Sequence, residues 1–298
     1  MRVFGRLALA ILFCGASSVA AEPLTFGRVD GDVREATAGL AAMSAYVAER
    51  VEGLEAARPM IFDSLPELIE AMRAGRVDLA SETIYGALVL ERDAGGRLLM
   101  REHRKGERRY RSVILVRDDG PMTFEDLVGA RVAFEDPGST SGFFLPVSAL
   151  LASGAELRLI PNMRAEAPRG KVGYAFLDDE QSIPLAIAAG IAQAGGFSEG
   201  DWLETRADFP EVAGRLQVMM RSPYVIRSLL IAGPSLPERF VPQIMAVFAA
   251  LSETESGRAI AKIYNSADAY DSLEGAEAAA DLAAGRALFA NFGRRLPQ

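Results

Sequence analysis

Residues 129–142 read GARVAFEDPGSTSG. Residues 131–134, of which the last three are apolar, are typical of a buried strand, and Pro137 followed by Gly138 is typical of a tight turn. The hydroxyl side chains that come next are of the kind that open helices. The first N–H groups of a helix have no partner within it and carry partial positive charge. This strand, turn and helix therefore predict an oxyanion site.

Three successive hydroxyl residues, Ser139, Thr140 and Ser141, stand at the predicted helix start. Each carries an O–H group that can donate a hydrogen bond to a tetrahedral anion. A serine in this place also serves as an N-cap, which needs no ligand. Because one hydroxyl is enough for a cap, three in succession favour a ligand-binding cradle.

Strands and helices alternate on both sides of this stretch. An apolar run over residues 24–29 precedes a helical pattern in which Leu40, Met43 and Val47 are three to four residues apart. Comparable pairs of strand and helix recur along the chain. Such alternation predicts an α/β fold with mainly parallel sheets covered by helices.

The pattern of turns divides the chain into two lobes with two hinge crossings. Residues 118–121, Asp-Asp-Gly-Pro, end a strand pattern, so the hinge is expected near residues 110–118. The chain is expected to return at Ser222. We thus predict that lobe 1 comprises residues 22–115 and 222–298, and that lobe 2 comprises residues 116–221.

The N-terminus has the three parts of a secretory signal peptide. Arg2 and Arg6 precede an apolar run over residues 7–13, and small residues lead to Ala21. The run is shorter than the roughly 20 residues that a membrane-spanning helix needs. We expect residues 1–21 to be removed and the mature protein to be exported without inserting into a membrane. An uncleaved anchor is the alternative.

The composition excludes several classes of function. Cys14 is the only cysteine and lies in the signal peptide, and His103 is the only histidine. Disulfides and thiolate chemistry need a cysteine that the mature chain lacks, and a single histidine nearly excludes zinc sites and Ser-His-Asp triads. We therefore expect no metal, no cofactor and no enzymatic activity. The formal net charge of −8 argues against nucleic acid as a partner.

The segment from Asp136 to Pro146 resembles the signature of the periplasmic phosphate, phosphite and phosphonate binding proteins. Residues 75–80, 110–114 and 221–223 resemble flanking segments of that family. The resemblance implies a type II periplasmic-binding fold, in which two lobes close on a small phosphorus oxyanion. It also implies delivery of the ligand to an inner-membrane ABC permease, and we expect the protein to be a monomer in the periplasm.

The resemblance implies ligand-binding residues as well. Ser139, Thr140 and Ser141 correspond to the oxyanion cradle of the family. Tyr110 corresponds to a tyrosine on the hinge side that faces the ligand. These four residues are the central part of the predicted site.

The first-lobe wall departs from the family pattern. Many relatives carry a Gly-Pro step and a tyrosine after this strand, whereas residues 81–86 of this chain read SETIYG. Tyr85 is expected either to replace the missing aromatic residue or to pack in the core. Glu82 or Thr83 is expected to meet a cationic or hydroxyl substituent of the ligand.

In the second lobe, Asp178, Asp179 and Glu180 follow a predicted strand. Acidic residues at a helix start suit the helix dipole, so solvated capping is one interpretation. The other is that Asp179 receives the ammonium group of an aminoalkyl phosphonate, as acidic residues do in this family. Ser198 begins a comparable turn and is expected to complete the pocket.

Two other functions stay open. A periplasmic sensor module would bind the same anion but report to a signalling partner. An enzyme on this scaffold would use Ser139 or Ser141 as its nucleophile, yet no histidine and no Ser-x-x-Lys pattern lies nearby to supply a base. The sequence favours a non-enzymatic solute-binding protein.

Overall fold

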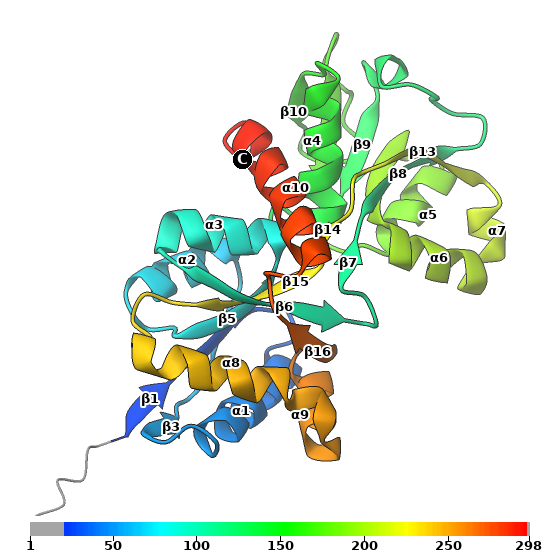
Figure 1. Ribbon diagram of the computed structural model, residues 1–298. Coiled ribbons are helices and arrows are strands. Elements are labelled where there is room, and N and C mark those ends of the chain that lie inside the picture. Colours follow the sequence, from blue (N-terminus) through cyan, green and yellow to red (C-terminus); the bar gives the residue numbers. More distant parts are fainter. Residues whose placement is uncertain (1–20, 297–298) are drawn as a thin grey trace, which may run out of the picture.

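The computed structural model describes residues 21–296, which form two lobes (Figure 1). The predicted signal peptide and Cys14 lie outside the described residues, except that Ala21 is the first of them. Within that range no helix is long and apolar enough to cross a membrane.

The first lobe contains a mixed six-stranded sheet. Its strands are β2 (Phe26–Val29), β4 (Met60–Phe62), β5 (Leu79–Thr83), β6 (Arg97–Arg104), β15 (Ser228–Ala232) and β16 (Ala267–Asp271). They lie in the order β16-β6-β15-β5-β2-β4. β2 pairs in parallel with β4 and β5, as expected for repeated strand-helix units. β15 and β16 come later in the chain and pair antiparallel with their neighbours, so the parallel pairs occupy one side of this sheet.

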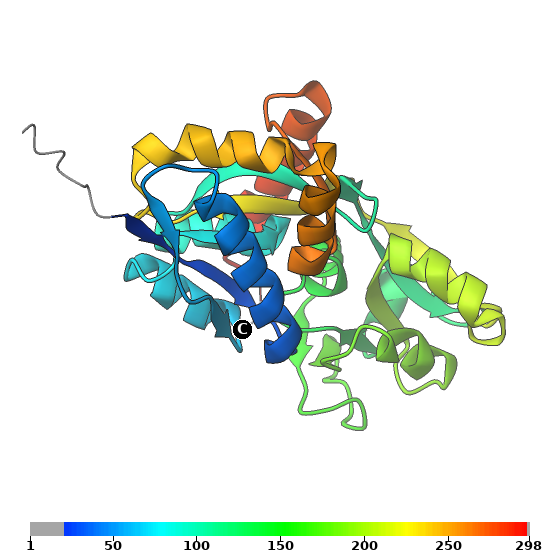
Figure 2. The ribbon, with the colours of Figure 1, turned by 90° about the horizontal axis from the view of Figure 1, so that it is seen from below.

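Helices cover both faces of the first sheet (Figures 1 and 2). They are α1 (Val33–Ala48), α2 (Leu65–Arg73), α3 (Ile84–Ala94), α8 (Val241–Ala249) and α9 (Glu255–Asn265), and the short strands β1 (Glu22–Leu24) and β3 (Leu54–Ala56) pair next to them. α1 begins where the Asp32 carboxylate accepts hydrogen bonds from the N–H groups of Arg34 and Glu35. Its apolar stripe is buried in the core, as its spacing predicted.

The second lobe contains the mainly parallel sheet that the sequence predicted. Its strands are β8 (Ser112–Arg117), β9 (Arg131–Phe134), β10 (Leu157–Leu159), β11 (Val172–Phe176), β12 (Ala194–Ser198) and β13 (Leu216–Arg221). They lie in the order β10-β11-β9-β12-β8-β13, and β8 runs against the other five. The helices of this lobe are α4 (Leu145–Ala152), α5 (Ser182–Ala188), α6 (Glu199–Asp208) and α7 (Pro210–Ala213).

Two short strands carry the chain between the lobes. β7 (Arg109–Tyr110) leaves the first lobe and pairs antiparallel with β14 (Val225–Ile226), which returns to it. β8 follows β7 after one residue, and all of it pairs within the second sheet. The predicted lobe boundary between residues 115 and 116 therefore falls inside a second-lobe strand, and the first crossing lies nearer residue 111.

Glu199 and the helix α10 (Ala276–Phe292) stabilise the crossings. The Glu199 carboxylate accepts hydrogen bonds from Arg111 Nε at 2.5 Å and from Arg221 Nε at 2.8 Å, so it joins the residue after β7 to the last residue of β13. α10 packs against β14, against α3 of the first lobe and against α4 of the second (Figure 1). The C-terminal helix thus contacts both lobes at the hinge.

Gly39 marks a close approach of α1 to α9. A Cβ atom at Gly39 would lie 2.2 Å from the backbone oxygen of Ile263. We expect Gly39→Ala to force the helices apart and to lower the free energy of unfolding by about 1–3 kcal/mol. A Cβ at Gly31 would meet nothing within 4 Å, so Gly31→Ala is the control and should change stability by less than about 0.5 kcal/mol. Urea unfolding measures the stability of both variants. If Gly39→Ala were as stable as Gly31→Ala, the close approach of α1 to α9 would be contradicted.

Candidate functional site

The candidate site lies where the carboxyl ends of strands from both lobes meet. β5 of the first lobe ends with Glu82 and Thr83, and β9 of the second lobe ends just before Glu135. In α/β proteins, ligands bind at the carboxyl ends of parallel strands. A hydrogen bond between Thr83 and Thr140 shows that these two ends are in contact.

The turn after β9 opens a helix, as the sequence predicted. The Asp136 carboxylate accepts a hydrogen bond from Gly138 N at 2.6 Å, which tightens the turn. Ser139 is extended, and its Oγ accepts a hydrogen bond from Gly142 N at 2.9 Å. The helix begins as the π-helical turn η2 (Thr140–Phe144) and continues into α4. Ser139 is therefore an N-cap in this structure, which is one of the two interpretations that the sequence left open.

Thr140 connects the lobes and is 1% exposed. Its Oγ1 accepts a hydrogen bond from Tyr85 N at 3.0 Å and donates one to Thr83 Oγ1 at 2.8 Å. Tyr85 lies in the first turn of α3, and Thr140 is the first residue of η2. The N-terminal ends of α3 and η2 therefore face each other across the boundary between the lobes.

Ser141 and Tyr110 are buried close to Thr140. Ser141 is 8% exposed, and its carbonyl oxygen accepts a hydrogen bond from Ser112 Oγ at 2.6 Å. Tyr110 is 4% exposed, and burial raises its pKa to about 12. Thr140 lies close to Tyr110 and lowers this pKa. Tyr110 Oη nevertheless meets no hydrogen-bond partner of good geometry among the described residues. A buried hydroxyl without a partner is costly, so Tyr110 is a candidate ligand donor.

Tyr85 packs between the lobes. Its ring stacks on Phe144, with centroids 4.9 Å apart and an interplanar angle of 17°. It also meets Phe289 of α10, with centroids 6.1 Å apart, and burial raises the pKa of Tyr85. These contacts favour the interpretation of Tyr85 as a packing residue, and its role in holding a ligand stays a prediction.

Glu82 stands beside Thr83 at the end of β5. Burial raises the pKa of its carboxyl group to about 7, and the positive charges of Arg28 and Arg104 oppose the shift. At neutral pH the carboxyl group is therefore protonated in a large share of the molecules. Glu82 can act as a hydrogen-bond donor or as an acceptor.

Of the three carboxylates that follow β11, Glu180 faces inward and Asp179 does not. Asp179 is exposed, and its oxygens accept hydrogen bonds from Gln181 N and Ser182 Oγ at the start of α5. Glu180 Oε1 accepts one from Ser198 N at 3.1 Å. The structure thus fits the solvated capping interpretation of Asp179, and Glu180 replaces it as the candidate acid of the second-lobe wall.

The second-lobe wall holds acidic groups close together. Burial raises the pKa of Glu180 to about 8, and the carboxyl groups of Glu135 and Asp201 add to the shift. Ser198 is 1% exposed and caps α6, because its Oγ accepts a hydrogen bond from Asp201 N at 3.4 Å. Ser198 thus positions this wall through its backbone and its cap.

Two arginines of the site were not predicted. Arg28, near the end of β2, donates from Nη1 to the backbone oxygen of Tyr264 at 2.6 Å and pairs with Asp30 at 2.8 Å. Arg104 ends β6, burial lowers its pKa, and its Nε has no hydrogen-bond partner within the described part of the chain. The only sequence feature that could have pointed to Arg28 and Arg104 is their position near the ends of strands. Neither residue belongs to a recognisable motif.

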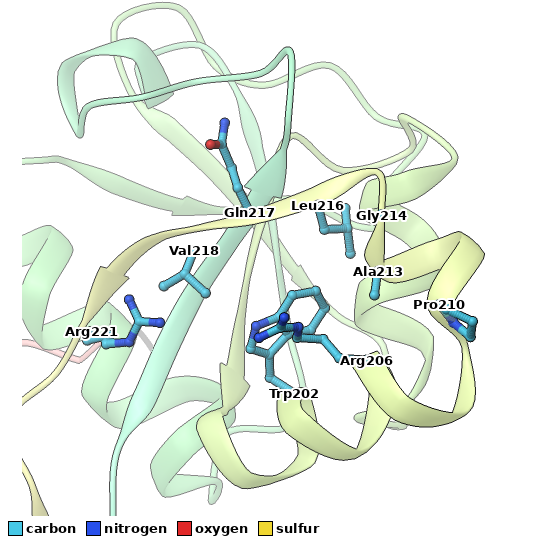
Figure 3. Close-up of a pocket in the computed structure, with 9 residues that line it drawn as sticks. All are labelled: Trp202, Arg206, Pro210, Ala213, Gly214, Leu216, Gln217, Val218 and Arg221. Carbon is cyan, nitrogen blue, oxygen red and sulfur yellow. The ribbon is translucent and has the colours of Figure 1, made fainter.

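A hollow with a volume of about 550 Å³ lies elsewhere on the second lobe. Trp202 and Arg206 of α6 and Gln217 and Arg221 of β13 are among its lining residues (Figure 3). The predicted site residues do not line it, and the Arg221 side chain is bound to Glu199. This hollow is therefore not part of the candidate site.

Metal ligands are not grouped in the described residues: no three His, Cys, Asp or Glu side chains there are placed to hold an ion. His103 lies on β6, and its Nε2 is 3.1 Å from a carboxylate oxygen of Asp271. The candidate site therefore consists of hydroxyl groups, helix N-termini, carboxyl groups and two arginines.

Solved structures share this fold. The protein XAC2383 from Xanthomonas citri, bound to ATP, has a TM-score of 0.84 and 20% identity, covering 93% of this chain and 100% of that one. PhnD1 from Prochlorococcus marinus, in complex with methylphosphonate, has a TM-score of 0.63 and 16% identity, covering 90% and 98%. These likenesses establish the type II periplasmic-binding fold.

Sequence comparisons establish the family. The phosphate-import protein PhnD of Mycolicibacterium smegmatis is 28% identical over 191 residues, and the match spans 61% of this chain and 57% of that relative. The family model described as ABC transporter, phosphonate, periplasmic substrate-binding protein matches residues 30–277. The predicted resemblance is confirmed, and the chain belongs to this family of periplasmic substrate-binding proteins.

Proposed function

We propose that the protein captures a phosphorus oxyanion between its lobes and delivers it to the permease of an ABC importer. The observation that carries the proposal is the meeting of two helix N-termini, those of α3 and of η2 with α4, at the Thr140 hydroxyl. First-turn N–H groups lack helical partners and carry partial positive charge, so both helix ends favour an anion placed between them.

Hydroxyl groups around this point supply further donors to the same anion. Thr83, Thr140, Ser141 and Tyr110 come from both lobes, and Tyr110 Oη has no other partner among the described residues. Thr140 would exchange its hydrogen bond to Thr83 for one to the ligand. A ligand that contacts both lobes favours their closed arrangement, because these contacts are absent when the lobes separate.

The acidic wall of the second lobe suits a ligand with a cationic substituent. Glu180 and Glu135 are partly buried, burial raises the pKa of both, and the charge of Glu135 adds to the shift of Glu180. An ammonium group on the alkyl chain of a phosphonate would neutralise this wall, with Asp179 at its exposed rim. Aminoalkyl phosphonates are therefore included with phosphate, phosphite and methylphosphonate in the ligand class.

The same proposal makes the protein a non-enzymatic, monomeric carrier, with its signal peptide cleaved near Ala21. The one histidine, His103, is paired with Asp271, and among the described residues it makes no hydrogen bond to Ser139 that would activate this serine as a nucleophile. A sensor would bind its ligand in the same way, and a signalling partner would take the place of the permease.

Ligand binding should stabilise the folded protein. At about 100 times its Kd, a ligand that binds only the folded state raises the free energy of unfolding by about 2.7 kcal/mol. The unfolding temperature should therefore rise in the presence of phosphate, phosphite, methylphosphonate or 2-aminoethylphosphonate. Titration calorimetry should give one binding site per chain. ATP completes the panel because the Xanthomonas citri protein is described bound to it. If no phosphorus compound shifts the unfolding temperature or gives heat, the proposed function is wrong.

Two variants separate ligand donors from structural caps. Tyr110→Phe removes a hydroxyl without a partner among the described residues, so ligand-free stability should stay level or rise. Its affinity for the oxyanion should fall about 10- to 150-fold, because a hydrogen bond to a charged group contributes about 1.5–3 kcal/mol. Ser139→Ala removes the N-cap and should lower the free energy of unfolding by about 1 kcal/mol, with affinity within about twofold of wild type.

Urea unfolding and calorimetric titration on the same preparations measure both effects. Wild-type affinity in Tyr110→Phe would remove Tyr110 from the site. A loss of affinity in Ser139→Ala as large as that in Tyr110→Phe would show that Ser139 belongs to the cradle after all.

A further inference from the structure

The Glu82 carboxyl group lies at the first turn of α3. A Cβ atom at Gly86 in that turn would be 2.9 Å from Glu82 Oε2. Within residues 21–296 the backbone oxygen of Glu82 accepts a hydrogen bond from Ser228 Oγ at 3.2 Å, whereas its side-chain oxygens take part in no hydrogen bond or ion pair. The carboxyl group therefore stands next to one of the two helix ends that would hold the oxyanion, and it is not committed to another residue.

Charged groups from several elements act on this carboxyl group. Arg28 of β2 and Arg104 of β6 favour its ionised form, whereas Asp136 of the turn after β9 and Glu102 of β6 disfavour it. Tyr264 of α9 is close enough to feel the charge of Glu82. Burial has the largest effect and raises the pKa of Glu82 to about 7, so the carboxyl group gains or loses its proton near neutral pH.

An oxyanion at the ends of α3 and η2 would lie beside this group. Two anions in contact repel strongly where little water screens them, whereas one proton between two oxygens makes a strong hydrogen bond. Tyr110 Oη points independently to a ligand here, because it is buried near Thr140 and makes no hydrogen bond with a described residue. One proton between Glu82 and the oxyanion would therefore turn a repulsive contact into an attractive one.

We propose, on the basis of the proposed function, that Glu82 and the bound oxyanion share one proton, which makes Glu82 a specificity-determining residue of the site. Either partner can bring the proton. Orthophosphate keeps a P–OH group into strongly alkaline solution, so it can donate to an ionised Glu82. The dianions of phosphite and methylphosphonate have no such proton and need the neutral form of Glu82.

The test compares inorganic phosphate with methylphosphonate by calorimetry across alkaline pH. Between about pH 8 and about pH 9.5, methylphosphonate should lose about tenfold in affinity per pH unit relative to phosphate, because its complex must take up a proton. Other groups that titrate in this range, such as Glu180, act on both ligands and largely cancel in the ratio. A constant ratio of the two affinities in the wild-type protein would overturn the proposal.

The variant Glu82→Gln provides the second test. Its amide group can donate or accept at any pH, so the affinity ratio should become independent of pH. Methylphosphonate should bind the variant at least about tenfold more tightly than wild type at about pH 9.5. Glu52→Gln is the matched control, because Glu52 is exposed and outside the site, and it should keep the wild-type slope.

The outcomes distinguish this inference from the proposed function. If neither phosphate nor methylphosphonate binds at any pH, the proposed function fails and the inference falls with it. If both bind but Glu82→Gln keeps the wild-type slope, the proposed function stands and the role of Glu82 is wrong. Thermal unfolding of each variant checks that the protein used in the titration is folded.

Discussion

The contact of two helix N-termini at one threonine oxygen is the constraint on which the site depends. Like ends of helix dipoles repel, and the first N–H groups of both helices need acceptors. Thr140 Oγ1 provides one, since it accepts a hydrogen bond from Tyr85 N and donates to Thr83. An oxyanion at the same place would present several acceptor oxygens to both helix ends at once. The geometry that brings the lobes together is therefore also the geometry that favours an anion.

The lobes also need a means of associating that does not compete with the ligand. Tyr85, Phe144 and Phe289 form an aromatic group at the boundary, and each of them comes from a different helical segment. Away from the aromatic rings, Lys105 of the first lobe reaches Asp201 of the second at 3.4 Å. None of these contacts uses the hydroxyl groups of the site, so packing can position the two walls while polar groups choose the ligand.

The sequence predicted the parts of the site that local chemistry determines. A strand, a Pro-Gly turn and hydroxyl residues specify a helix start, and that helix start is present. The choice among Asp178, Asp179 and Glu180 was not predictable, because Asp178 has φ of 58° and side-chain direction after such a residue depends on the backbone. The first crossing was placed late because β8 continues without a break from the hinge into the second sheet. Arg104 has no motif, and only the fold brings it near Glu82.

The overall charge of −8 and an anion site are compatible because they act over different distances. Salt screens exposed charges beyond about 8 Å, so distant surface carboxylates have little effect on a ligand held between the lobes. The carboxyl groups inside the site are the ones that matter, and burial raises the pKa of Glu82 to about 7 and of Glu180 to about 8. Fixed negative charges at these places would repel the oxyanion group of the ligand. Carboxyl groups that can be neutral at physiological pH let the site adjust its charge to the protons that its ligand carries.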